Sequence, residues 1–129
     1  MKKRVRAVII ENGKILLIHR VKNNEEYWVF PGGGIEPSDK NPETALQREC
    51  REELGTLVRV KPVFFEDEDE TFFVCDITEG DLGTGKGPEF EKGTFYQGTY
   101  QLEWLPIDLL DGYRVLPDVV KKKLEDHYE

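Results

Sequence analysis

Glu49, Glu52 and Glu53 are the residues whose type and spacing most clearly suggest chemistry. On a helix, at roughly 100° per residue, they share one side, next to an apolar stripe that contains Leu46 and Cys50. Like charges at these spacings repel by about 0.2–0.5 kcal/mol per pair, and the helix dipole disfavours anions near a C-terminus. A divalent cation would remove both penalties, because Mg²⁺ binds carboxylates together with substrate phosphates. A solvated glutamate-rich helix face is the alternative explanation.

A glycine-rich segment precedes these acids, because residues 28–37 read WVFPGGGIEP. Glycines allow the backbone to approach a ligand closely. A glycine loop is weak evidence by itself, and so are three acids. Their combination is more specific: the loop is followed by Arg48-Glu49, then by Glu52-Glu53, and then by Gly55.

The acids need a helix to hold them, and the local sequence predicts one. Asn41 is a good N-cap, Pro42 suits the first helical position, and Gly55 provides a C-terminal stop. We expect β-strands on both sides of this helix, with a hairpin at Asn12-Gly13. The expected strands are 5–10, 15–18, 27–30, 57–65, 71–77 and 95–105, and a helical turn at 106–110 and a terminal helix at 117–127 complete the chain.

Two further segments lie between these elements. Glu66 to Glu70 is a run of five acids that we expect to form a solvated turn. Residues 79–93 are rich in glycine and are expected to form a long loop, a kind of segment that is often functional. Strands interleaved with two helices predict an α/β sandwich with a mixed sheet.

Composition narrows the function classes. The chain has 129 residues, which predicts a single domain over 1–129. With 18 basic and 26 acidic residues, the net charge is −8, which argues against a nucleic-acid partner or an acidic membrane surface. An anionic substrate stays allowed if a bound cation inverts the local charge. Two cysteines and the lack of a long apolar run predict a reduced, cytoplasmic protein.

The compound pattern resembles the signature box of the Nudix hydrolases. Gly33 matches its opening glycine, and Trp28 with Pro31-Gly32 matches the usual lead-in. The second half of the box, R-E-U-x-E-E-x-G with U apolar, is matched residue for residue over 48–55. The resemblance implies a Nudix-type α/β/α sandwich with a mixed β-sheet.

The box departs from the family pattern at its middle. An aspartate, Asp39, stands where the family has a glutamate, and eight residues instead of seven separate it from Arg48. The glutamates keep their mutual spacing, so the extra residue must precede the helix. We expect Lys40 to be exposed in a bulge, the helix to begin at Asn41 or Pro42, and Asp39 to turn back toward the glycine loop.

The resemblance implies hydrolysis of a pyrophosphate bond in a nucleoside di- or triphosphate derivative by metal-activated water. It assigns Arg48, Glu49 and Glu52 to catalysis. It assigns Glu49, Glu52, Glu53 and the Gly33 carbonyl to a cofactor, Mg²⁺, with Mn²⁺ as the alternative. The base is left open, since family members take it from the box or from a later loop.

Outside the box, Glu89 in the 79–93 loop is the candidate for a further metal ligand, and Glu91 competes with it. Arg20 is the candidate for binding substrate phosphates, because a guanidinium fork fits phosphate well. A surface cation is an equal alternative for Arg20. His19 and His127 are interpreted as non-catalytic, and no aromatic residue is assigned to a nucleobase.

Two functions therefore remain, an enzyme and a non-catalytic nucleotide-sensing domain of the same fold. A sensor would be expected to lose box acids, whereas Glu49, Glu52 and Glu53 are all present, which favours the enzyme. The proline of the family's ADP-ribose subgroup and the tyrosine of its diadenosine polyphosphate subgroup are absent. Nucleoside triphosphates or their damaged forms are then the expected small-molecule substrates, and the resemblance leaves a homodimer open.

Overall fold

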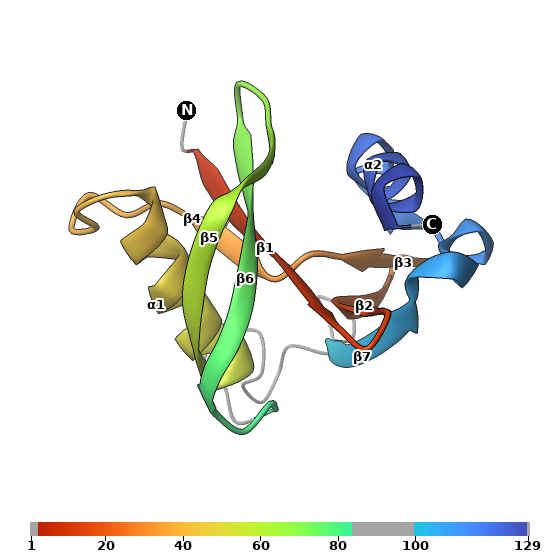
Figure 1. Ribbon diagram of the computed structural model, residues 1–129, viewed down its shortest axis with the longest axis horizontal. Coiled ribbons are helices and arrows are strands. Elements are labelled where there is room, and N and C mark those ends of the chain that lie inside the picture. Colours follow the sequence, from red (N-terminus) through yellow and green to blue (C-terminus); the bar gives the residue numbers. More distant parts are fainter. Residues whose placement is uncertain (1–2, 84–99, 129) are drawn as a thin grey trace.

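A mixed β-sheet forms the centre of the protein in the computed structural model, which describes residues 3–83 and 100–128 (Figure 1). The sheet strands are β1 (Arg4–Glu11), β2 (Lys14–Lys22), β3 (Glu25–Val29), β4 (Gly32–Gly34), β5 (Thr56–Glu66), β6 (Glu70–Gly80), β7 (Gln101–Pro106) and β8 (Val115–Leu116). The helices are α1 (Pro42–Leu54), the 3-10 helix η3 (Ile107–Gly112) and α2 (Asp118–Tyr128).

The strands run in the order β5-β6-β1-β2-β3-β8, with β4 also paired to β1 and β7 to β2. The β1–β6 and β3–β8 pairs are parallel and the other pairs are antiparallel. The expected mixed sheet is therefore confirmed.

Two apolar clusters lie on the two sides of β1. Val5, Ala7 and Ile9 pack with the buried stripe of α1, whereas Val8 belongs to the cluster that includes α2. This alternation follows from the twofold period of a strand. Helices α1 and α2 lie on opposite sides of the strands in Figure 1. The expected α/β/α sandwich is therefore confirmed. None of the helices in the described residues is long and apolar enough to cross a bilayer.

The ends of α1 agree with the sequence prediction. The Asn41 side chain accepts a hydrogen bond of 2.8 Å from the Thr44 N–H, and Pro42 is the first helical residue. Gly55 ends the helix at φ 77°, a left-handed conformation that glycine adopts without steric cost. Lys40 is exposed, so the extra residue of the box lies before the helix, as expected.

Several expected boundaries are wrong. The glycine segment is expected from its sequence to be a loop, yet Gly32–Gly34 forms β4 by pairing with Arg4–Arg6 of β1. The expected turn at Glu66 to Glu70 is shorter, because Glu66 ends β5 and Glu70 begins β6. β2 extends beyond its expected end at residue 18, and the sequence does not predict β8. For β4 and β8, pairing with a strand distant in sequence supplies hydrogen bonds that the local sequence does not reveal. The longer β2 and the shorter turn arise because the β2–β3 and β5–β6 hairpins continue pairing beyond the expected strand ends.

Gly32 gives a test of how tightly β4 packs on β1. Its φ is 142°, and a Cβ there would strike the Val5 carbonyl oxygen. We expect Gly32→Ala to lower the melting temperature by about 10 °C or more, since strain and overpacking each cost about 1–3 kcal/mol. Gly112→Ala is the control, because a Cβ on Gly112 would meet no atom of the described residues within 4 Å beyond its chain neighbours. Equal melting temperatures for the two variants, measured by calorimetry, would contradict this packing.

Candidate active site

Glu53 joins the box helix to the glycine segment. Its Oε1 accepts a hydrogen bond of 2.6 Å from the Gly32 N–H, and Glu53 is only 5% exposed. An ionised acceptor makes such bonds short and strong. The carboxylate is therefore fixed against β4 from within α1.

Glu49 lies against the next glycine. A Cβ on Gly33 would come within 2.5 Å of Glu49 Oε2, so any other residue would push this carboxylate away. The absence of a side chain at Gly33 thus leaves room for the Glu49 carboxylate beside β4. Glycine at position 33 therefore allows the carboxylate to approach the backbone of β4 closely.

Arg48 links three carboxylates of the site, those of Asp39, Glu49 and Glu52. Its Nη1 donates to Glu49 Oε2 and Glu52 Oε1, both at 3.2 Å, and its Nη2 donates to the Gly34 carbonyl at 3.1 Å. The hydrogen bond with Asp39, followed by the charges of the nearby acids, raises the pKa of the Arg48 guanidinium above its usual range although burial opposes this. The repulsion expected between Glu49 and Glu52 is thereby offset by a cation placed between them.

Asp39 holds Arg48 with both carboxylate oxygens. The distances are 3.1 Å from Nε to Oδ1 and 2.9 Å from Nη2 to Oδ2. Asp39 Oδ2 also accepts a hydrogen bond of 2.7 Å from the Glu36 N–H. Asp39 therefore turns back toward the glycine segment as expected, and Arg48 bridges the remaining distance to Gly34.

A cleft of about 370 Å³ opens beside this network. Glu49, Glu53 and β4 line one part of it, and Arg20 lines another with its guanidinium 4.0 Å from the centre of the Tyr100 ring. Acids that can hold a cation thus face a guanidinium that can bind phosphate oxygens. The remaining lining residues are Arg4, Arg6, Ile18, Tyr27 and Val29.

The structure brings some of the predicted site residues together and leaves others apart. Glu49, Glu53, Gly33 and Arg20 line the same cleft. Glu52 is not among the lining residues, its side chain is 46% exposed, and it is connected to Glu49 through Arg48. Glu89 and Glu91 lie outside the described residues. In the described part of the chain, no three His, Cys, Asp or Glu side chains converge as a finished metal site.

The donors that are present nevertheless suit a hard cation. Mg²⁺ prefers oxygen ligands, often one or two carboxylates completed by water and substrate phosphate. Glu49 and Glu53 provide carboxylates in one cleft, and Gly33 lines the same cleft. The residues therefore fit a divalent ion that is completed by its substrate.

Sequence reasoning missed Arg4, Arg6 and Tyr100 as lining residues of the cleft. A signal for the arginines was available, because positions two apart on a strand point to the same face. Tyr100 is brought next to Arg20 only by the pairing of β7 with β2, in which Gln101 lies opposite His19. Nothing in the local sequence around Tyr100 indicates that contact.

His19 is not among the residues that line the cleft. Its ring is stacked on Trp28 at 4.5 Å between centroids, and its Nε2 lies 2.7 Å from Glu26 Oε2. Trp28 is buried in the cluster that also contains residues of α2. These contacts agree with the structural interpretation of His19, and Trp28 acts as part of the core.

Comparison with known families agrees with this geometry. The model of the NUDIX domain matches residues 1–123, nearly the whole chain. The chain belongs to the NUDIX family. Its box helix and glycine segment are the α1 and β4 described above, so the resemblance seen in the sequence is confirmed.

Individual relatives of this NUDIX domain are similar over shorter stretches. The CTP pyrophosphohydrolase of Escherichia coli K12 is 47% identical over 53 residues, which are 40% of this chain and 38% of that protein. The RNA pyrophosphohydrolase of Pseudomonas putida F1 is 46% identical over 51 residues, 38% of this chain and 30% of that protein. The matched stretches thus span less than two fifths of these relatives. The solution structure of the E. coli ORF135 protein is 27% identical with a TM-score of 0.65, covering 97% of this chain and 86% of that one.

The reactivity of the Cys50 thiol provides a test of how the box helix is oriented. It lies on the buried side of α1, and burial raises the pKa of its thiol well above the usual value. Burial likewise raises the pKa of the Cys75 thiol to about 12. Because the thiolate is the reactive form, we expect neither cysteine of the native protein to be alkylated appreciably between pH 7 and 9.

Mass spectrometry after iodoacetamide treatment measures this directly. Both thiols should react at least about 100-fold faster once urea unfolds the chain, because exposure restores a pKa near 8.5. Rapid native alkylation of Cys50 at pH 8 would contradict the burial of this helix face.

Proposed function

We propose that this NUDIX domain hydrolyses a pyrophosphate bond in a nucleoside di- or triphosphate derivative, with Mg²⁺ as cofactor and Mn²⁺ as a substitute. One observation carries the proposal: Glu49 and Glu53 face the same cleft as Arg20. Pyrophosphate hydrolysis needs a hard cation held by carboxylates and positive charge near the substrate phosphates. The Glu49, Glu53 and Arg20 side chains around this cleft support the proposal on both points.

Each residue then has a definite task. Glu49, Glu52, Glu53 and the Gly33 carbonyl would hold the cation, which when bound would neutralise phosphate charge and lower the pKa of a water molecule. Arg20 binds phosphate oxygens. Arg48 contacts both Glu49 and Glu52 and orients them.

A carboxylate must also accept the proton of the attacking water. Glu49 and Glu52 are the candidates within the box, and Glu89 is the candidate outside it. Glutamine variants at these three positions separate the alternatives, because loss of the base lowers turnover even at saturating metal. The loss of a metal ligand, in contrast, is partly compensated by a higher metal concentration.

Small nucleotides are the substrates we propose first. The relatives named above act on CTP and on RNA according to their names, and the net charge of −8 favours the small molecule over the polyanion. The test is a panel of ribo- and deoxyribonucleoside triphosphates, diphosphate-linked nucleotides and 5′-triphosphorylated RNA with Mg²⁺. Release of phosphate or pyrophosphate identifies the substrate. Tight binding without turnover of any member would indicate the sensing function instead.

The glutamates provide the sharpest activity test. We expect Glu52→Gln and Glu53→Gln each to lower turnover at least ~100-fold, about 2.7 kcal/mol of barrier, because each removes a carboxylate that holds the cation. Glu43→Gln is the matched control, since Glu43 lies exposed in the first turn of the same helix. Turnover of either site variant near that of the control would refute its assignment as a metal ligand.

Metal binding can also be measured without substrate. Mg²⁺ should raise the melting temperature, because a ligand that binds only the folded state stabilises it by mass action. We expect this rise to vanish in the Glu49→Gln, Glu52→Gln double variant. An equal rise in the wild type and the double variant would place the ion elsewhere, with Glu66 to Glu70 as the first region to examine.

A further inference from the structure

Three consecutive carbonyl groups at the start of β4 are all held by two neighbouring residues of β1. Arg6 Nη1 donates to the carbonyl oxygens of Phe30 and Gly32, both at 3.3 Å. Between them, the Ala7 N–H donates to the Pro31 carbonyl oxygen at 2.8 Å. The peptide planes on both sides of the Pro31–Gly32 peptide are thus fixed by one guanidinium.

The peptide plane between Pro31 and Gly32 connects β1 to the candidate active site. The Pro31 carbonyl and the Gly32 N–H belong to one rigid peptide unit. Its oxygen accepts from Ala7, and its N–H donates to Glu53 Oε1 at 2.6 Å. Any rotation of this plane would therefore move the N–H off the carboxylate.

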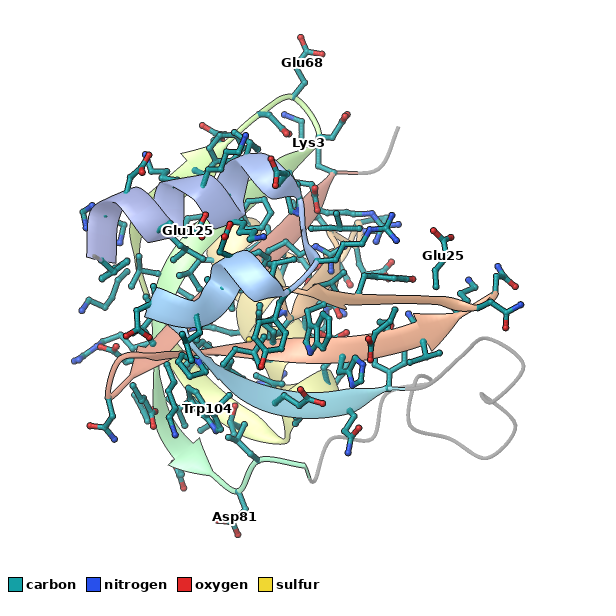
Figure 2. All side chains as sticks on the ribbon, turned by 90° about the vertical axis from the view of Figure 1, so that its right-hand side faces the viewer. Lys3, Glu25, Glu68, Asp81, Trp104 and Glu125 are labelled. Carbon is teal, nitrogen blue, oxygen red and sulfur yellow. The ribbon has the colours of Figure 1, made fainter. Side chains whose placement is uncertain are left out.

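Arg6 is itself held by Glu70. The Arg6 Nε lies 2.9 Å from Glu70 Oε2, and the two side chains are only 19% and 23% exposed. Partial burial makes this charge-assisted bond more effective than an exposed pair. Glu70 thus differs from Glu68, whose side chain projects outward from the tip of the β5–β6 hairpin in Figure 2.

We propose that Arg6, oriented by Glu70, is a positioning residue for Glu53. It holds the two flanking peptide planes so that the Gly32 N–H stays directed at the Glu53 carboxylate. A loose plane would weaken the short hydrogen bond that holds Glu53 Oε1 at its present position. The effect of Arg6 on turnover rests on the proposed function, whereas the effect of Arg6 on the Gly32 amide does not.

Hydrogen exchange of the Gly32 amide in the metal-free protein, followed by NMR, tests the structural step. We expect exchange to be at least about tenfold faster in Arg6→Met and in Glu70→Ala, because the amide loses a stable acceptor. Arg59→Met is the control: Arg59 also pairs across strands with a carboxylate, Asp76 at 3.2 Å, but the pair is exposed. Exchange in Arg59→Met should equal that of the wild type.

Conservative variants keep the test decisive if a truncation fails to fold. Glu70→Gln retains an acceptor for Arg6, and Arg6→Lys retains the charge but cannot span Glu70 and two carbonyls together. We expect Glu70→Gln to keep Gly32 exchange near the wild-type rate and Arg6→Lys to raise it. Wild-type exchange in Arg6→Lys, or in both truncations, would overturn the proposal.

A double-mutant cycle tests whether Arg6 acts through Glu53. Arg6→Met should lower kcat about 10–100-fold, the usual cost of losing a residue that supports a metal ligand, while KM changes less than about twofold. In a Glu53→Gln background the same substitution should cost less than about threefold, because the residue it positions is already altered. Additive losses, or a loss confined to KM, would overturn the proposal.

The two proposals fail in different ways. A wild-type protein that hydrolyses no member of the nucleotide panel would refute the proposed function. Gly32 exchange would still decide the role of Arg6 in that case. An active wild type whose Gly32 exchange is unchanged in Arg6→Met would refute the positioning role alone.

Discussion

The hydrogen bond between the Gly32 N–H and Glu53 is the contact on which the candidate active site depends. This hydrogen bond of 2.6 Å connects the box helix α1 to the short strand β4, and its acceptor is a buried carboxylate. Because β4 consists of three glycines, it is held only through its backbone, which pairs with β1 and also bonds to the side chains of Arg6, Arg48 and Glu53. The orientation of Glu53 is therefore decided by the backbone of a different element.

Electrostatic balance is the second constraint. Several carboxylates beside one another would repel, yet Arg48 lies between Glu49 and Glu52 and is held in turn by Asp39. Removing one partner from such a network costs more than a simple surface pair, since the remaining charges are partly buried. In the same network Asp39, which stands where the family has a glutamate, binds Arg48 with both carboxylate oxygens, and Arg48 donates to the Gly34 carbonyl.

The central strand β1 ties these parts together. One of its faces packs on α1 through Val5, Ala7 and Ile9, and its edge holds β4. On this strand Arg4 and Arg6 line the cleft, and Arg6 also fixes the carbonyls at the start of β4. A single strand thus supports the core, the glycine segment and part of the cleft wall, so substitutions in β1 are expected to affect stability and site geometry together.

The box helix, its two ends and the shared face of its glutamates could be predicted from the sequence, because caps and a 3.6-residue period are local properties. The sequence also indicated the family and the sandwich of mixed strands. Three other features became visible only in the folded protein: Gly32–Gly34 is a strand, Glu70 pairs with Arg6, and Tyr100 lies beside Arg20. These contacts join residues far apart in the chain, and their geometry arises from strand pairing and packing, which no local pattern encodes.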